Sequence, residues 1–208
     1  MVVMKDPDSG WINYGAYRVQ AQGPGVASLM TSKGKHGDII RNKWHERGEP
    51  CPIAVVAGMH PALFMVAGLE MPYGKNEYDC AGGLLGEGVE IINMPKTGLP
   101  VPANAEIAFE GFIHPDDRID EGPLGEWTGY YAGGALGTGK NQPVIRVKAI
   151  YHRDDPILLN MAPQWPGAPH LGKPWPRNFP TGRLGTLSHC LLRNHHYHHY
   201  HHYHYHSR

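Results

Sequence analysis

The chain has 208 residues, with 19 basic and 19 acidic side chains, so its formal net charge at neutral pH is zero when histidine is counted as neutral. This length suits one good-sized domain, or one domain with an appendage. The charge balance argues against a general nucleic-acid or membrane-surface binder. Glycine (27) and proline (19) are both frequent, which favours a loop-rich β or mixed domain over a helical bundle.

The cysteines and the first residues indicate a compartment. Cys51, Cys80 and Cys190 are scattered and form no CxxC pair, and an odd count without metal-ligand spacing is typical of a reduced protein. The opening MVVMKDPDSGW lacks the apolar core of a signal peptide, and no stretch approaches the roughly 18 apolar residues of a membrane span. We therefore expect a cytoplasmic protein without a membrane span.

Short apolar segments of strand length, rich in Val or Ile, alternate with turn signals over residues 1–160. Two stretches suit helices better: residues 36–48, where Gly48 supplies a stop, and residues 60–72. The predicted strands lie within residues 50–58, 88–95, 105–113 and 143–152. The third of them alternates acidic and apolar residues imperfectly, as a half-buried strand can. Several strands with few helices predict a mainly β or α+β fold built around a β-barrel.

Residues 167–208 differ in composition from the globular segment, residues 1–166, that precedes them. A Pro/Gly-rich stretch leads into NHHYHHYHHYHYHSR, and nine of the 15 histidines lie from His189 onward. A tract of this kind cannot bury a core, so we predict a low-complexity, disordered C-terminal tail. One form of this interpretation is a shifted reading frame, which would make the tail an accident of translation.

EGPLGEWTGYY, residues 121–131, places two carboxylates, Glu121 and Glu126, five residues apart in a stretch broken by Gly and Pro. The aromatic residues that follow could supply a low-dielectric wall. One acid would then be kept neutral as a proton donor, while the other stays ionised beside a cation. An exposed turn with two solvated acids is the simpler alternative.

WINYGAYR, residues 11–18, joins an amide, Asn13, to a guanidinium, Arg18, through residues that could wall a planar ligand. The guanidinium is permanently charged and can clamp a carboxylate through two parallel hydrogen bonds. Taken alone, this pattern also suits a strand with a surface arginine. A carboxylate ligand or partner for Arg18 is therefore one of two open interpretations.

KGKHGD, residues 33–38, leads a basic run to His36, and NEYDCAGG, residues 76–83, places Glu77 ahead of a small-residue turn. Each feature alone is unremarkable, because a lone histidine is more often structural than a ligand. Asn13, His36 and Glu77 together would make an oxygen and nitrogen site for Mn²⁺ or Mg²⁺. Such ions prefer hard ligands and tolerate one imidazole.

WINYGAYR, EYDCAGG, LPVPANAEIAFEG and EGPLGEWTGYY, followed by PVIRVKAIYHRDDPIL, together resemble the central part of the UbiD family of decarboxylases. The resemblance covers roughly residues 8–166, with several separated motifs in order at compatible spacings. It implies a split β-barrel of the flavin reductase-like, FMN-binding type. It also implies reversible, non-oxidative removal of CO₂ from aromatic or α,β-unsaturated carboxylic acids, using prenylated FMN.

The resemblance also implies roles for single residues. Arg18 and Glu121 resemble the paired arginine and glutamate that position the substrate, and Glu126 resembles the glutamate that exchanges a proton with the substrate carbon. The implied ligands of Mn²⁺ (or Mg²⁺) are Asn13, His36 and Glu77, with K⁺ nearby. The implied cofactor contacts are Asn13, Tyr14, Gly15, Ala16, Tyr17, Arg18, Lys35, His36 and Glu77.

Members of the family carry an α/β region before this segment and a C-terminal region after it, which completes the active site and mediates dimerisation. The resemblance therefore implies that a full-length form is a homo-oligomer. A flavin prenyltransferase would supply the cofactor, the substrate would be a small carboxylic acid, and no nucleic-acid partner is expected. An inactive fragment, or a non-catalytic flavin- or metal-binding barrel, is the alternative function.

Overall fold

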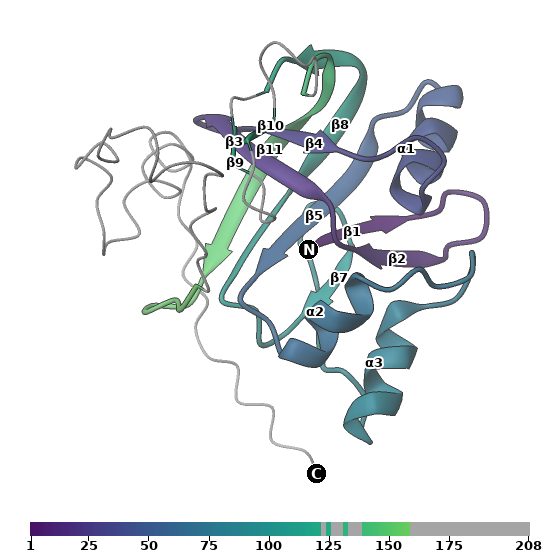
Figure 1. Cartoon of the computed structure of the whole chain (residues 1–208), viewed down its shortest axis with the longest axis vertical. Coiled ribbons are helices and arrows are strands. Elements are labelled where there is room, and N and C mark those ends of the chain that lie inside the picture. Colours follow the sequence, from purple (N-terminus) through teal and green to yellow (C-terminus); the bar gives the residue numbers. More distant parts are fainter. Residues whose placement is uncertain (122–123, 126–130, 133–138, 159–208) are drawn as a thin grey trace, which may run out of the picture.

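The computed structural model describes residues 1–121, 124–125, 131–132 and 139–158, and the side chains of residues 122–138 are outside this description. The predicted tail, residues 167–208, and the predicted proton donor Glu126 lie outside the described residues. Within them, the core is one seven-stranded antiparallel sheet with the strand order β2-β1-β5-β8-β11-β4-β3 (Figure 1). Its strands are β1 (Val2–Lys5), β2 (Ile12–Gly15), β3 (Arg18–Gly23), β4 (Val26–Met30), β5 (Cys51–Ala57), β8 (Ile107–Ile119) and β11 (Gln142–His152).

Four shorter strands form two small ladders beside the main sheet. β6 (Ile91–Asn93) pairs with β7 (Pro100–Pro102), and β9 (Leu124–Gly125) pairs with β10 (Tyr131–Ala132). The second ladder lies within the sequence that carries both predicted glutamates. All four strands predicted from the sequence are present, although β6 covers only three residues of the predicted 88–95.

The two edge strands of the main sheet are neighbours in the sequence, and this forces the sheet to curl. β2 ends at Gly15 and β3 begins at Arg18, yet they lie at opposite edges of the sheet. Only Ala16 and Tyr17 connect them, and three Cα–Cα steps span at most about 11 Å. The edges must therefore approach each other, and the sheet forms a strongly curled half-barrel (Figure 1). The predicted mainly β, barrel-like fold is confirmed.

Both faces of the central strands are buried. On β1, Val3 belongs to one apolar cluster and Met4 to the other, and neighbouring residues of β5 alternate in the same way. In Figure 1, α1 (His36–Glu46) lies on one side of the β1–β2 hairpin, while α2 (Pro61–Ala67) and α3 (Glu77–Leu85) lie together on the other. This double cover explains why β5 has a continuous apolar sequence.

The half-buried pattern predicted for residues 105–113 is wrong for most of that segment. Ala108, Phe109 and Glu110 are consecutive in β8 and all buried. Alternating exposure begins only at His114, in the part of β8 that continues beyond the predicted strand. The inner part is covered on both faces by the two clusters, whereas the outer part has one open face.

The helices correct one prediction and confirm two. α1 starts at the predicted residue and stops before Gly48, whose φ of 73° ends the helix. α2 is shorter than the predicted 60–72, because the chain leaves the helix at Gly68. The small-residue turn expected after Glu77 lies instead inside α3, which begins after Asn76, whose side chain accepts a hydrogen bond from the Tyr78 amide at 3.0 Å. No helix in the described part of the chain is long and apolar enough to cross a membrane.

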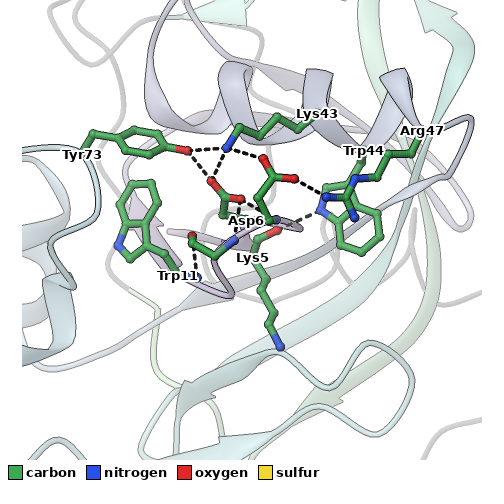
Figure 2. Close-up of polar contacts among 9 residues, drawn as sticks. Lys5, Asp6, Trp11, Lys43, Trp44, Arg47 and Tyr73 are labelled. Atoms are coloured by element: carbon green, nitrogen blue, oxygen red, sulfur yellow. Dashed lines mark hydrogen bonds and ion pairs between the residues drawn. The ribbon is translucent and has the colours of Figure 1, made fainter.

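A buried carboxylate, Asp6, organises the turn between β1 and β2. Its Oδ1 accepts backbone hydrogen bonds from Asp8 at 2.8 Å and Ser9 at 3.3 Å. Its Oδ2 accepts from Lys43 Nζ at 2.8 Å and from the Tyr73 hydroxyl (Figure 2). Burial acts to raise the pKa of Asp6, but the hydrogen bonds from Lys43, Tyr73 and the turn outweigh it and lower that pKa to about 2.

Replacing Asp6 with Asn is expected to lower the free energy of unfolding at pH 7 by about 2 kcal/mol. This loss corresponds to the lowering of the Asp6 pKa to about 2 in the folded protein. Because the folded pKa lies below the unfolded value, this stabilisation is present above about pH 4 and is lost as the pH falls towards 2. Urea unfolding at pH 7 and pH 2.5 measures it. Asp8→Asn is the matched control, since Asp8 is exposed and contacts the same lysine. A D6N penalty that is equal at both pH values would contradict this ionic account.

Candidate active site

A pocket of about 580 Å³ lies at the seam where the two edges of the sheet meet. This volume is within the roughly 300–1,000 Å³ usual for small-molecule sites. One wall is the connection between β2 and β3, a second is the turn that leads into α1, and a third is the loop after α2. Six of the nine predicted cofactor contacts line this pocket: Gly15, Ala16, Tyr17, Arg18, Lys35 and His36. The other three are buried and do not line it: Asn13, Tyr14 and Glu77.

Arg18 and Glu121 form a direct ion pair, although 103 residues separate them in the sequence. Arg18 Nε donates to Glu121 Oε1 at 2.7 Å, and Arg18 Nη2 donates to the same oxygen. The other carboxylate oxygen accepts from the Ser28 hydroxyl on β4. The Glu121 amide donates to the Gly139 carbonyl at 2.7 Å. Both the backbone and the side chain of Glu121 are therefore fixed.

The ion pair is asymmetric in its surroundings. The Glu121 side chain is fully buried, whereas the Arg18 side chain keeps 18% of its exposure and lines the pocket. A buried carboxylate needs a fixed cation, because removing one partner of such a pair leaves an uncompensated charge. The guanidinium thus stands in a fixed orientation at the pocket wall, where its positive charge can hold an anionic group.

Glu77 and Asn13 are brought close by the contact between α3 and β2. Glu77 Oε2 accepts a hydrogen bond from the Tyr14 amide at 3.1 Å, so the carboxylate lies beside the residue that follows Asn13. Burial raises the pKa of Glu77, and the hydrogen bond from Tyr14 only partly offsets this effect. A bound cation would reverse that cost, since it would favour the ionised carboxylate.

Tyr17 links Asn13 to the first turn of α1. Its hydroxyl accepts a hydrogen bond from the Gly37 amide at 2.9 Å and lies 3.4 Å from Asn13 Nδ2. The ring fits closely between two glycines. A Cβ atom at Gly15 would lie 2.6 Å from the Tyr17 ring, and one at Gly37 would lie 2.9 Å from it. The absence of side chains at these two positions therefore permits this arrangement.

His36 is the first residue of α1 and lines the pocket. Burial, assisted by the positive charge of Lys35 and opposed by Glu70, lowers the pKa of His36. This shift favours the neutral imidazole, which is the form that binds metals. Within the described residues, neither ring nitrogen has a hydrogen-bond partner.

Of the three predicted metal ligands, Asn13 contacts the Tyr17 hydroxyl, Glu77 contacts the Tyr14 amide, and His36 precedes Gly37, whose amide donates to Tyr17. Within the described chain no hydrogen bond joins any two of the three. Among those same residues, no group of three or more His, Cys, Asp or Glu side chains gathers in a way that could hold a metal. The predicted set is of another composition, with one amide, one imidazole and one carboxylate. Its donor types suit Mn²⁺ or Mg²⁺.

Local sequence did not indicate two residues that contact predicted site residues: Glu70, which lines the pocket, and Ser28, which lies outside its lining. Lys35 Nζ forms an ion pair with Glu70, which belongs to the loop after α2 and also lines the pocket. Ser28 was missed as a partner of Glu121, because β4 carries no motif that distinguishes it. The sequence does contain a signal for Glu70. Gly68 is a helix-stop residue inside the predicted helix 60–72, and it places Glu70 in a loop instead of in the helix.

Comparison with known proteins identifies the family. The family described as "UbiD: 3-octaprenyl-4-hydroxybenzoate carboxy-lyase Rift-related domain" matches residues 1–166. The chain therefore belongs to the UbiD family. It is 36% identical over 178 residues to a phenolic acid decarboxylase of Streptomyces sp. (strain D7), covering 84% of this chain and 35% of that protein. It is 38% identical over 156 residues to a pyrrole-2-carboxylic acid decarboxylase of Pseudomonas aeruginosa, covering 75% of this chain and 31% of that one.

The fold is similar to that of solved UbiD-class structures. Two structures of the UbiD-class enzyme HmfF from Pelotomaculum thermopropionicum, one in complex with FMN and an evolved dimeric form in complex with prFMN, align with a TM-score of 0.69 and 33% identity. The alignments cover 76% of this chain and 34% and 35% of those chains. The chain thus spans about a third of the length of the curated relatives that it matches.

Proposed function

We propose that this chain provides the cofactor-binding and catalytic barrel of a carboxy-lyase. The reaction would be the reversible, non-oxidative decarboxylation of an aromatic or α,β-unsaturated carboxylic acid with prenylated FMN. The observation that carries this proposal is the fixed Arg18–Glu121 pair at the wall of a pocket lined by six predicted cofactor contacts. Relatives that act on phenolic and pyrrole carboxylic acids support the same class of substrate.

The pocket residues fit a flavin mononucleotide. Gly15 and Ala16 present small side chains and backbone at one wall, which lets a planar ring system approach closely. Lys35 and Arg18 both line the pocket; each is paired with a glutamate, and their N–H groups can still donate to an anionic cofactor or substrate. When bound, the prenylated flavin supplies the electron sink for the carbon that loses CO₂.

Asn13, His36 and Glu77 would hold a divalent cation, Mn²⁺ or Mg²⁺, beside the cofactor phosphate, with K⁺ nearby. Two observations support this assignment. Burial favours the neutral form of the His36 imidazole, which has no hydrogen-bond partner within the described residues, and the ionised form of the buried Glu77 carboxylate would be stabilised by a nearby cation. The amide oxygen of Asn13 would complete a set of hard ligands.

The chain's own acid and base groups would then divide the work. Arg18 would bind the substrate carboxylate and hold its carbon in place for CO₂ loss. Glu121 would fix the orientation of that guanidinium. Glu126, which lies outside the described residues, would donate the proton that replaces CO₂ and take it back in the reverse reaction.

The wider setting of the protein follows from the same proposal. A flavin prenyltransferase would supply the cofactor in the cytoplasm, and a full-length form would be a homo-oligomer. The domain boundary is proposed near residue 166, where the family match ends.

The proposal is tested by CO₂ release. The protein is produced together with a flavin prenyltransferase and supplied with phenolic, cinnamic-type and pyrrole carboxylic acids, and we expect CO₂ from at least one class. The proton step is followed separately by incubating the decarboxylated product in D₂O and measuring hydrogen–deuterium exchange at the carbon that had carried the carboxylate. Stable flavin binding without CO₂ or exchange across all three classes would favour a non-catalytic flavin-binding barrel.

A further inference from the structure

Three aromatic rings from separate parts of the chain meet beside the pocket. They are Trp11 before β2, His36 at the start of α1, and Tyr73 in the loop between α2 and α3. The His36 ring centroid lies 5.1 Å from that of Trp11 and 5.4 Å from that of Tyr73, at interplanar angles of 76° and 84°. The Trp11 and Tyr73 rings themselves are 4.6 Å apart. His36 therefore has edge-to-face contacts on two sides.

These ring contacts stand in place of the hydrogen bond that usually orients a metal-binding histidine. Such a histidine normally donates its second ring nitrogen to a carboxylate or carbonyl, which fixes the ring. Within the described residues, His36 has no such hydrogen bond. The rings of Trp11 and Tyr73 instead pack against its imidazole on two sides.

Tyr73 is itself held by a polar anchor rather than by burial, since it is 46% exposed. Figure 2 shows Tyr73, Lys43 and Asp6 pointing towards one another. The Tyr73 hydroxyl donates to Asp6 Oδ2 and accepts from Lys43 Nζ at 3.1 Å. Lys43 Nζ also donates to Asp6 Oδ2 at 2.8 Å, and this carboxylate is fixed by the β1–β2 turn. The ring of Tyr73 is thus tied to the sheet.

The second ring is tied to the same loop. Trp11 Nε1 donates to the Lys75 carbonyl at 3.0 Å. The loop that carries Tyr73 and Lys75 also supplies Glu70, Met71 and Pro72 to the pocket wall. One loop therefore contacts both the proposed metal ligand and the proposed cofactor pocket.

We propose that Tyr73, anchored by Asp6 and Lys43, is a positioning residue that orients the His36 imidazole for metal binding. The inference rests on the proposed function, because it takes His36 as a metal ligand. Without the Tyr73 ring, the imidazole keeps its position on α1 but can adopt unproductive rotamers. The affinity for the metal then falls, while the fold is retained.

The test is titration of the whole chain with Mn²⁺ alone, followed by electron paramagnetic resonance. Spin-echo spectra of the bound ion report whether an imidazole nitrogen is coordinated. Tyr73→Leu is expected to weaken Mn²⁺ binding about tenfold, the lower end of the loss seen when a group that orients a metal ligand is removed. The coupling between the bound Mn²⁺ and the imidazole nitrogen should be weaker in this variant as well. Tyr73→Phe keeps the ring but loses the hydroxyl contacts with Asp6 and Lys43, so its affinity and coupling should fall between those of Tyr73→Leu and of the wild type.

Phe64→Leu is the matched control, because Phe64 is a similarly exposed aromatic residue on α2 that has no ring contact with His36. Wild-type affinity and coupling in Tyr73→Leu would overturn the inference while leaving the metal site intact. Wild-type affinity and coupling in Tyr73→Phe would overturn the anchoring by Asp6 and Lys43, because the hydroxyl would then have no part in orienting the ring. If the wild-type spectrum shows no imidazole nitrogen, or if His36→Ala leaves it unchanged, the metal assignment itself fails and the inference fails with it.

Discussion

Replacing Arg18 with Lys is expected to lower kcat/KM for decarboxylation by about 100-fold or more, in protein loaded with prenylated FMN. Arg18 directs both Nε and Nη2 at one oxygen of Glu121. Lysine retains the positive charge but offers a single flexible ammonium group, so it cannot keep the forked geometry. The charge at the pocket wall would remain, but its position relative to a substrate carboxylate would not.

The chain offers a matched control for this substitution. Arg146 makes a similar two-nitrogen contact with Asp117, through Nε and through Nη2 at 2.9 Å, but it does not line the pocket. Arg146→Lys should change kcat/KM less than about twofold, because exposed ion pairs contribute little. Flavin content must be equal in all variants. Activity of Arg18→Lys within threefold of wild type would contradict the proposed role of the ion pair.

Replacing Glu110 with Ala is expected to lower the free energy of unfolding by roughly 3–5 kcal/mol. Glu110 lies in β8 with no exposed surface. It accepts hydrogen bonds from the Lys96 amide at 3.0 Å, from the amide and hydroxyl of Thr97 at 2.8 Å, and from the Tyr151 hydroxyl at 2.8 Å. These bonds fix the turn between β6 and β7 to the sheet. Truncation removes the acceptor for the half-buried donors of the β6–β7 turn and for the buried Tyr151 hydroxyl, and it leaves a cavity in the sheet core.

Urea unfolding monitored by tryptophan fluorescence measures this loss. Asp116→Ala is the control, since Asp116 is an exposed acid on the same strand and should change stability by less than about 0.5 kcal/mol. Glu110→Gln should fall between the two, because the amide keeps one acceptor oxygen but brings an N–H group against the donors. A penalty for Glu110→Ala below 1 kcal/mol would show that the carboxylate does not hold the turn.

Local sequence predicted the elements whose stability is local. The Val- and Ile-rich runs of β5 and β11 were placed within two residues, and the start of α1 was correct. α3 was missed because the glycines at 82 and 83 suggested a turn, although Asn76 as a cap and Glu77 in the first turn indicated a helix. The second half of β8 was missed because it is held by pairing with β11, from Gln142 opposite Ile119, which only the tertiary fold provides.

The same distinction holds for the site: residue types could be predicted from local sequence, but contacts between distant residues could not. The residue types in WINYGAYR and EGPLGEWTGYY indicated a cation and an acid, and the family resemblance paired Arg18 with Glu121. Spacing could not have paired them, because the contact depends on the end of β8 reaching β3 and β4 through the sheet order. Glu110 looked like a solvent-facing residue of an alternating strand, yet it is buried. No local motif marks Lys43 or Tyr73, because their contacts with Asp6 join three separate segments of the chain.

The central claim is that a flavin mononucleotide binds at the seam of the barrel through a divalent cation held by Asn13, His36 and Glu77. The most direct test is a fluorescence titration of FMN against this chain, with Mn²⁺ and with excess EDTA. We predict saturable binding that Mn²⁺ strengthens and that weakens at least about tenfold in His36→Ala and in Glu77→Ala. FMN affinity that is the same with Mn²⁺ and with EDTA, and unchanged in both variants, would contradict the claim.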